Sequence, residues 1–343
     1  MNRRALATLV SQGLVALLAA GCRAESTGTP SAVVPGLLAS ENAADDPPRF
    51  SAWSPPVNLG PPVNTPFIDQ APSISKDGLS LYFHCGDCPT NIGGADIYVS
   101  HRTQVGDPWG PPQRLGPNIN TIANEQGPRL SRDGHQLFFA SDRTGFGGFD
   151  LYVSRRRDKR DDFGWEPAVS LGGDINTSED EATPDPFEDD ATSTITLYFG
   201  RGPAVSTGGA GAVDIYVSTL RADGTYGPGL PVTELNSPST DRQPAIRRDG
   251  LEIFFASDRP GRIGALDLWV ATRATTADGW STPVNLGPVV NSTQVDARPA
   301  LSFDGTTLYF QSTRPGAVGC ASGATSCVFD LLVTTRSKLK GPD

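Results

Sequence analysis

The chain has 343 residues, a formal net charge of −10, 38 glycines and 30 prolines. This abundance of turn-forming residues favours many short strands over long helices. The acidic balance excludes a nucleic-acid partner, which needs a basic face, and it excludes electrostatic adhesion to anionic lipid.

The first 22 residues have the pattern of an export signal. Arg3 and Arg4 precede an apolar stretch from Leu14 to Ala20, which is too short to span a bilayer as a stable anchor. The signal ends in LAAGC, which resembles the lipobox of bacterial lipoproteins. That resemblance implies removal of residues 1–21 and lipidation of Cys22. An ordinary cleaved signal with a chance cysteine is the alternative.

Residues 22–50 follow the signal and are rich in alanine, serine, proline and acids, without a hydrophobic period. We predict a flexible tether there, leading to a folded domain over residues 51–343. Arg23 rather than aspartate follows the cysteine. The lipoprotein resemblance therefore implies an outer-membrane lipoprotein that faces the periplasm or the cell surface and contacts the membrane through its lipid alone.

The predicted domain contains a fivefold internal repeat. An aromatic residue before a proline-containing strand opens each repeat, at Trp53, Trp109, Trp165, Tyr226 and Trp280. An asparagine before threonine or serine follows, at Asn64, Asn120, Asn176, Asn236 and Asn291, with spacings of 56, 56, 60 and 55 residues. Matches that stay in phase over the whole domain indicate a repeat architecture.

Each repeat predicts four short strands. Asp-Gly turns at 77–78, 133–134, 249–250 and 304–305 separate two apolar runs, and a third run such as Asp150-Leu-Tyr-Val-Ser follows a glycine-rich loop. We therefore predict an all-β, five-bladed β-propeller of four-stranded blades. A strand near 53–59 would join the last blade beside a strand near 330–335 and so close the ring.

Two motifs resemble the WD40-like repeats of TolB-type propellers over nearly all of residues 53–336. They are Ser-x-Asp-Gly-x-x-Leu-Phe-Phe-Ala-Ser-Asp-Arg and Gly-Gly-x-Asp-Leu-Tyr-Val-Ser. Repeat one departs from them with His-Cys-Gly-Asp-Cys at 84–88, and repeat three with Gly200-Arg201-Gly202. The resemblance implies the fold and says little about partners.

Five acids should form a ring at the mouth of the central channel. They are Asp69, Glu125, Glu181, Asp241 and Asp296, each five residues after a repeat asparagine. One interpretation is a candidate ligand-binding ring for a cation or a cationic ligand. The other is structural: each acid accepts backbone N–H bonds, or pairs with the arginine of an adjacent Ser-Asp-Arg. We favour the structural interpretation, because a fold requirement recurs in every blade.

The loops between the second and third strands are expected to be structural joints. Their best copies contain Asp142, Arg143 and Asp150 in repeat two, and Asp258, Arg259 and Asp267 in repeat four. Aspartates at 96, 150, 214, 267 and 330 are expected to cap turns before the third strands. Calcium is only weakly indicated, since the acidic residues lack an EF-hand spacing. We predict no metal and no cofactor.

Four further cysteines lie in these loops, at Cys85, Cys88, Cys320 and Cys327. An oxidising compartment favours disulfides, and the local pairs 85–88 and 320–327 are preferred. Pairing across the neighbouring first and fifth blades, a four-thiolate zinc site and a redox-active pair are the alternatives.

Catalytic signatures are sparse. The chain has three histidines, at 84, 101 and 135, and no Gly-x-Ser-x-Gly elbow. We therefore predict a monomeric, non-enzymatic scaffold that binds an envelope protein or polysaccharide. The alternative is a carbohydrate-active five-bladed propeller, a glycosidase or a sugar-binding protein, that uses channel-mouth carboxylates.

Overall fold

The computed structural model describes residues 49–203, 213–320 and 327–340. The predicted signal peptide (1–21), Cys22 and all but the last two residues of the predicted tether lie outside the described residues. Within the described part of the chain, no helix is long and apolar enough to cross a bilayer.

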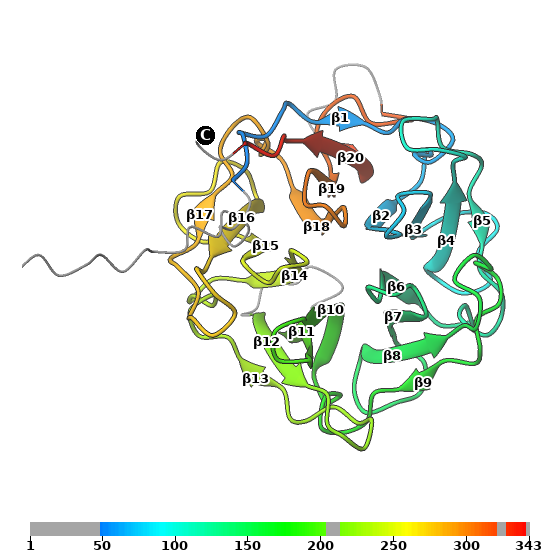
Figure 1. The fold of residues 1–343 in the computed structure, drawn as a ribbon. Helices are drawn as coiled ribbons and strands as arrows, with labels where there is room; N and C mark the ends of the chain where they lie inside the picture. Colours follow the sequence, from blue (N-terminus) through cyan, green and yellow to red (C-terminus); the bar gives the residue numbers. More distant parts are fainter. Residues whose placement is uncertain (1–48, 204–212, 321–326, 341–343) are drawn as a thin grey trace, which may run out of the picture. The chain divides into compact units, whose positions relative to one another are not determined.

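Twenty strands among the described residues form five antiparallel, four-stranded sheets, arranged as blades around a central channel (Figure 1). Blade one contains β2 (Asp69–Ile74), β3 (Ser80–Cys85), β4 (Asp96–His101) and β5 (Gln113–Arg114). Blade two contains β6 (Glu125–Leu130), β7 (Gln136–Ser141), β8 (Asp150–Arg155) and β9 (Val169–Ser170). Blade three contains β10 (Asp180–Asp189), β11 (Thr194–Gly202), β12 (Asp214–Thr219) and β13 (Leu230–Pro231).

Blade four contains β14 (Asp241–Ile246), β15 (Glu252–Ser257), β16 (Asp267–Thr272) and β17 (Val284–Asn285). Blade five contains β18 (Asp296–Leu301), β19 (Thr307–Ser312), β20 (Asp330–Thr335) and, from the other end of the domain, β1 (Val57–Asn58). Val57 lies opposite Val333 in the antiparallel pair that β1 forms with β20. The predicted five-bladed propeller and its closure by an N-terminal strand are both confirmed.

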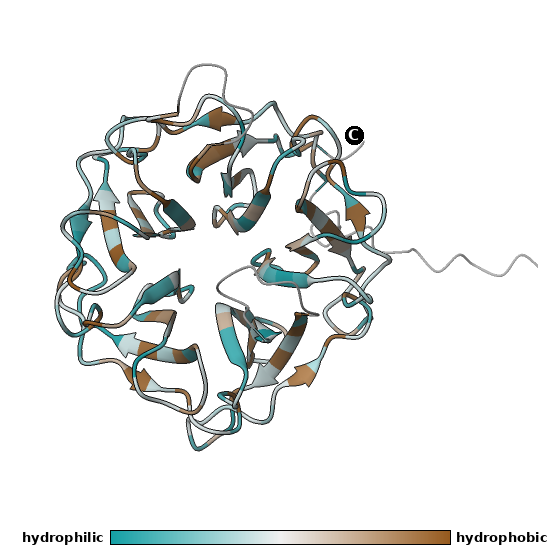
Figure 2. Cartoon of the chain, turned by 180° about the vertical axis from the view of Figure 1, so that it is seen from behind, coloured by the Kyte–Doolittle hydropathy of each residue, from teal (hydrophilic) through white to brown (hydrophobic). Residues whose placement is uncertain are grey.

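The apolar core is divided among the five interfaces between blades. At the interface of blades two and three, for example, Phe138 and Leu151 pack with Phe199 and Tyr226. Figure 2 shows hydrophilic residues on the inner strands around the channel and more hydrophobic ones on the middle and outer strands. Each blade therefore buries both faces of its sheet against its neighbours, while its inner strand lines a polar channel.

The repeated asparagines link neighbouring blades. Asn120 Oδ1 accepts a bond from the Ile97 amide at 2.8 Å, and Asn120 Nδ2 donates to the Ile97 carbonyl at 2.9 Å. Ile97 lies in β4 of blade one, whereas Asn120 precedes the first strand of blade two. This side chain satisfies both backbone groups of a buried residue, which explains why asparagine recurs once per repeat.

The repeated tryptophans are stacked under arginines on the face that carries the Asp-Gly turns, here called the turn face. The Arg156 guanidinium lies 4.4 Å from the Trp165 ring, and its Nε donates to the carbonyl of Gly134 in the adjacent turn. Arg102, Arg273 and Arg336 make the same pair of contacts in blades one, four and five. In blade three the position of this arginine is occupied by Leu220, and that blade also lacks the Asp-Gly turn.

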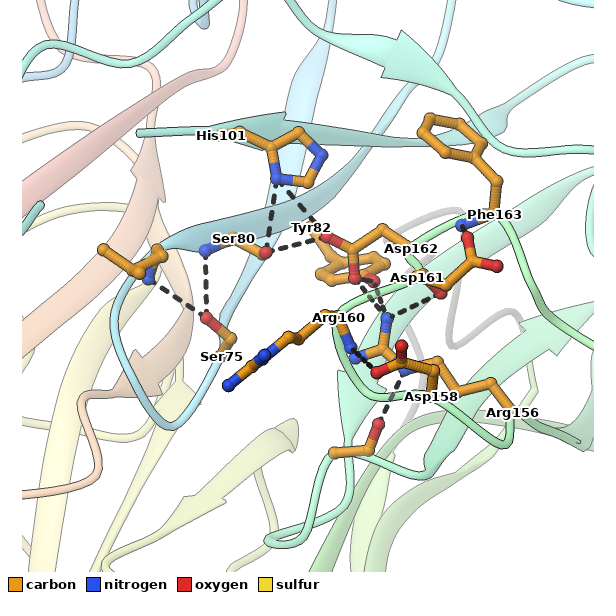
Figure 3. A network of polar contacts seen from close by, with 12 residues as sticks. Ser75, Ser80, Tyr82, His101, Arg156, Asp158, Arg160, Asp161, Asp162 and Phe163 are labelled. Carbon is orange, nitrogen blue, oxygen red and sulfur yellow. Dashed lines mark hydrogen bonds and ion pairs between the residues drawn. The ribbon is translucent and has the colours of Figure 1, made fainter. Parts of the chain in front are cut away.

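Blades one and two are joined on this face by a buried polar network (Figure 3). Asp162, in the turn after β8, pairs with Arg156 and accepts a hydrogen bond from the Tyr82 hydroxyl. Its other carboxylate oxygen accepts from Ser80 at 2.8 Å and lies 3.3 Å from His101 Nδ1. Buried charge is therefore compensated from three directions, as a buried ion pair requires.

Candidate functional site

The five predicted ring acids are all buried. Four of them, Glu125, Glu181, Asp241 and Asp296, pair with an arginine and accept bonds from the backbone amide and hydroxyl of a threonine or serine four residues earlier. Glu125, for example, accepts from Thr121 N at 2.8 Å and from Arg143 Nη2 at 3.0 Å. These carboxylates are occupied by the fold itself, so they leave no open ring for a ligand.

Arg201 shows that the loop of blade three keeps this pairing. Its Nε lies 2.8 Å from Glu181, and its Nη2 donates to the Ile175 carbonyl at 2.6 Å. Arg143 makes the matching bond to the carbonyl of Ile119. The sequence Gly200-Arg201-Gly202 departs from Ser-Asp-Arg, but the arginine still reaches the acid.

Asp69 is the exception, because blade one has the disulfide loop where the other blades have an arginine. Asp69 Oδ2 accepts from Thr65 N at 2.6 Å and from Thr65 Oγ1 at 2.8 Å, whereas its buried Oδ1 has no hydrogen-bond partner. Burial, partly offset by the Thr65 bonds, raises the pKa of Asp69 from 3.8 to about 7. This carboxyl borders a cavity of about 210 Å³ beside Phe67 and Tyr98.

The loops between the second and third strands are held in place by hydrogen bonds from nearby backbone amides to their aspartates. Asp142 accepts from Asn124 N at 2.7 Å, and Asp150 accepts from Phe146 N at 2.6 Å. In blade four, Asp258 and Asp267 make the matching bonds to Thr240 N and Ile263 N. A Cβ on Gly147 would lie 2.4 Å from the Thr177 carbonyl, so only glycine fits where the loop passes the next blade.

The cysteines form two local disulfides, Cys85–Cys88 and Cys320–Cys327. The preferred pairing is therefore confirmed, and the cross-blade and four-thiolate alternatives are not what the structure shows. Asp69 lies with Cys85 and Cys88 in a group of atoms of metal-ligand type. Both sulfurs are bonded to each other, so neither is the thiolate that a metal would need.

A pocket that sequence analysis missed lies at the end of the channel on the turn face. This turn-face pocket has a volume of about 100 Å³, and all five blades contribute to it. Its charged and aromatic lining consists of Lys76, Arg129, Arg132, Asp185, Phe187, Glu188, Arg248 and Phe303. Lys76 Nζ and the Arg248 guanidinium each lie 4.5 Å from the centre of the Phe303 ring. Cations from three blades thus gather around one aromatic ring.

Two carboxyl groups in this pocket have raised pKa values. Burial raises the pKa of Asp185 from 3.8 to about 6, although Arg129 Nε lies 2.9 Å away and opposes the shift. Asp185 also accepts a hydrogen bond from Ile246 N at 2.6 Å. Burial and the nearby Asp133 raise the pKa of Glu188, while Arg132 opposes that shift. Raised carboxyl pKa values in a cleft are typical of acid–base sites.

A sequence signal for this pocket exists in hindsight. The residue before Asp-Gly in these turns is Lys76 in blade one, Arg132 in blade two, Arg248 in blade four and Phe303 in blade five. These are the residues that line the turn-face pocket. The repeat pattern placed the turns on one face, but it did not show that their variable residues converge on the channel.

Solved structures that resemble this chain include α-L-arabinofuranosidases, a family-43 glycoside hydrolase and a xylanase. The catalytic domain of the GH62 α-L-arabinofuranosidase of Coprinopsis cinerea matches with a TM-score of 0.54 and 13% identity, over 84% of this chain and 98% of that one. The α-L-arabinofuranosidase of Lactobacillus brevis matches with a TM-score of 0.51 and 16% identity, over 78% and 91%. An endo-1,4-β-xylanase of Bacteroides thetaiotaomicron matches with a TM-score of 0.52 and 14% identity, over 81% and 97%.

No family model and no curated protein matches the sequence. At these identities the structural likeness shows the fold. The neighbours nevertheless contradict our expectation of a non-enzymatic scaffold, because those named here are all glycoside hydrolases. They favour the carbohydrate-active alternative. The expectation failed because it rested on the ring acids and the histidines, and it overlooked the turn-face pocket.

Proposed function

We propose that this protein is a carbohydrate-active propeller that binds a glycan in the turn-face pocket and hydrolyses it with Asp185 and Glu188. The observation that carries the proposal is the presence of two carboxyl groups with raised pKa values in one pocket on the channel axis. Arginine and lysine side chains around them can donate to sugar hydroxyls or to a sugar carboxylate. The hydrolase activity of the structural neighbours supports the same class of function.

The two carboxyl groups have the unlike surroundings that glycoside hydrolysis uses. Asp185 is buried, and its pKa, raised to about 6, suits a general acid that carries a proton in mildly acidic solution. Glu188 is half-buried and lies close enough to solvent to activate a water.

The test is turnover on a panel of arabinan, xylan and uronate-bearing polysaccharides. We expect Glu188→Gln and Asp185→Asn each to lower kcat by about 100-fold or more. The matched control is Asp223→Asn, which removes an exposed carboxyl in the turn after β12 and should leave turnover unchanged. Thermal melts of all the variants report whether each one is folded. No turnover of any glycan by the wild-type protein, or full activity in both pocket variants, would overturn the proposal.

We also propose that this protein is a monomeric propeller of the TolB-type repeat class, anchored in the outer membrane by a lipid on Cys22. In that position its propeller would face an envelope polysaccharide. The support is the LAAGC sequence before the cleavage point and Arg23 after it. Mass spectrometry of the mature N-terminus tests the anchor. An unlipidated Cys22, or a mature chain that starts elsewhere, would contradict it.

A further inference from the structure

The inner strands carry a repeated irregularity that points side chains into the channel. Each of the five has a bulge near its start, at the fourth residue of β10 and at the third residue of the other four, where the backbone adopts a positive φ. The bulge residues are Ala71, Gly127, Thr183, Gln243 and Arg298. They surround a small cavity deeper in the channel than the turn-face pocket, here called the channel cavity. Four of the five are uncharged, so Arg298 breaks the pattern.

The Arg298 guanidinium is buried with most of its donors unused. Its Nη2 donates to Gln126 Oε1 at 3.3 Å, whereas Nε and Nη1 have no hydrogen-bond partner. Burial, together with the positive charge of Arg242, lowers the pKa of Arg298 from 12.5 to about 9, so the group remains a cation at neutral pH. A buried charge without a partner is strongly destabilising, and this one needs an anion.

Among the residues that the structure describes, no carboxylate pairs with this charge. Asp185 lies in the neighbouring turn-face pocket, and it is paired with Arg129. The buried His84 beside Arg298 has a pKa lowered by burial and by the arginine's charge, so it adds no negative group. Residues 204–212, which lie outside the described residues, contain no acidic residue in their sequence. An anion from solution can supply the negative charge that the described carboxylates do not.

The size of the channel cavity limits what that anion can be. Its volume is about 10 Å³, which is space for one particle the size of a water molecule. Sulfate, phosphate and the carboxylate of a sugar are too large. We propose that the channel cavity binds a single chloride ion, held by Arg298 Nε and Nη1.

Anomalous diffraction from crystals grown in bromide tests the occupant directly. We expect one bromide peak within hydrogen-bond distance of Arg298 Nε and Nη1. A water at that position, with bromide bound only elsewhere, would overturn the proposal. This measurement uses the wild-type protein and does not depend on any variant folding.

Thermal melts at fixed ionic strength provide the second test. Replacing 100 mM sodium gluconate by 100 mM sodium chloride should raise the wild-type Tm by about 5 °C if the site is then nearly saturated. Arg298→Gln should abolish this difference, and it should fold, because Gln243 occupies the equivalent bulge of blade four. The control Arg157→Gln removes an exposed cation and should keep the wild-type response. Equal responses in wild type and Arg298→Gln would contradict the chloride site.

Discussion

Asp69 should make the propeller less stable as the pH rises from about 4 to 7. Its carboxyl is buried without the arginine that four other blades supply, and its pKa is raised to about 7 in the folded chain. The unfolded value is near 3.9. Between these values the folded state binds more protons than the unfolded state, so the free energy of unfolding falls with increasing pH. Three pKa units correspond to about 4 kcal/mol as an upper bound.

Urea unfolding of wild type and Asp69→Asn between pH 4.5 and 7.5 measures this effect. Other carboxyls also titrate, so the quantity to follow is the difference between the two proteins at each pH. We expect the stability of the variant relative to wild type to increase with pH, by up to about 4 kcal/mol. Parallel curves for the two proteins would refute the reasoning, because they would mean that the folded Asp69 has an ordinary pKa.

Asp304→Asn is the matched control with the opposite sign. Burial of Asp304 is more than offset by bonds from Ser302 and Thr306, so its pKa is lowered. This carboxylate contributes stability above its unfolded pKa and loses it as the pH falls. The control variant should therefore lose stability relative to wild type only as the pH rises toward about 4, and the difference should stay nearly constant between about pH 4.5 and 7.5.

Three further outcomes are expected from urea unfolding at neutral pH. Tyr82→Phe removes one hydroxyl from the buried network of Figure 3 and should cost about 1–3 kcal/mol, whereas no loss would mean that the hydroxyl is not buried there. Arg259→Met leaves the buried Asp241 without its cation and should cost about 3–5 kcal/mol; a smaller loss would mean that water reaches the carboxylate. Replacing Cys85 and Cys88 by serine opens a short loop and should cost about 2 kcal/mol, and insensitivity of wild type to reductant would argue against this disulfide.

The blades could be predicted from the sequence because the fold uses the same residue types at the same places. The repeated asparagine bonds to the preceding blade, and the repeated tryptophan stacks under an arginine. Such contacts depend on a particular side chain, so the repeat retains that residue type. Strand number and ring closure were predictable for the same reason, whereas the local disulfides were predicted from the expected oxidising compartment.

The sites were harder to predict because they depend on residues that differ between repeats. The bulge positions share a positive φ, but they hold residues as unlike as Ala71 and Arg298, so no residue type marks them. The turn-face pocket collects one variable residue from several turns. At Arg201 the Ser-Asp-Arg motif is altered in sequence, but the ion pair with Glu181 is still formed. A changed motif therefore does not always mean a changed contact.

The pairing of β1 with β20 places the two ends of the domain in one sheet. During synthesis or export, β1 therefore lacks its partner β20 until the last strand of the domain emerges. The early strand must wait unpaired, and the ring cannot lock before the whole domain is present. Joining the two ends and opening the chain between two other blades would change this order of assembly without removing any contact of the finished ring.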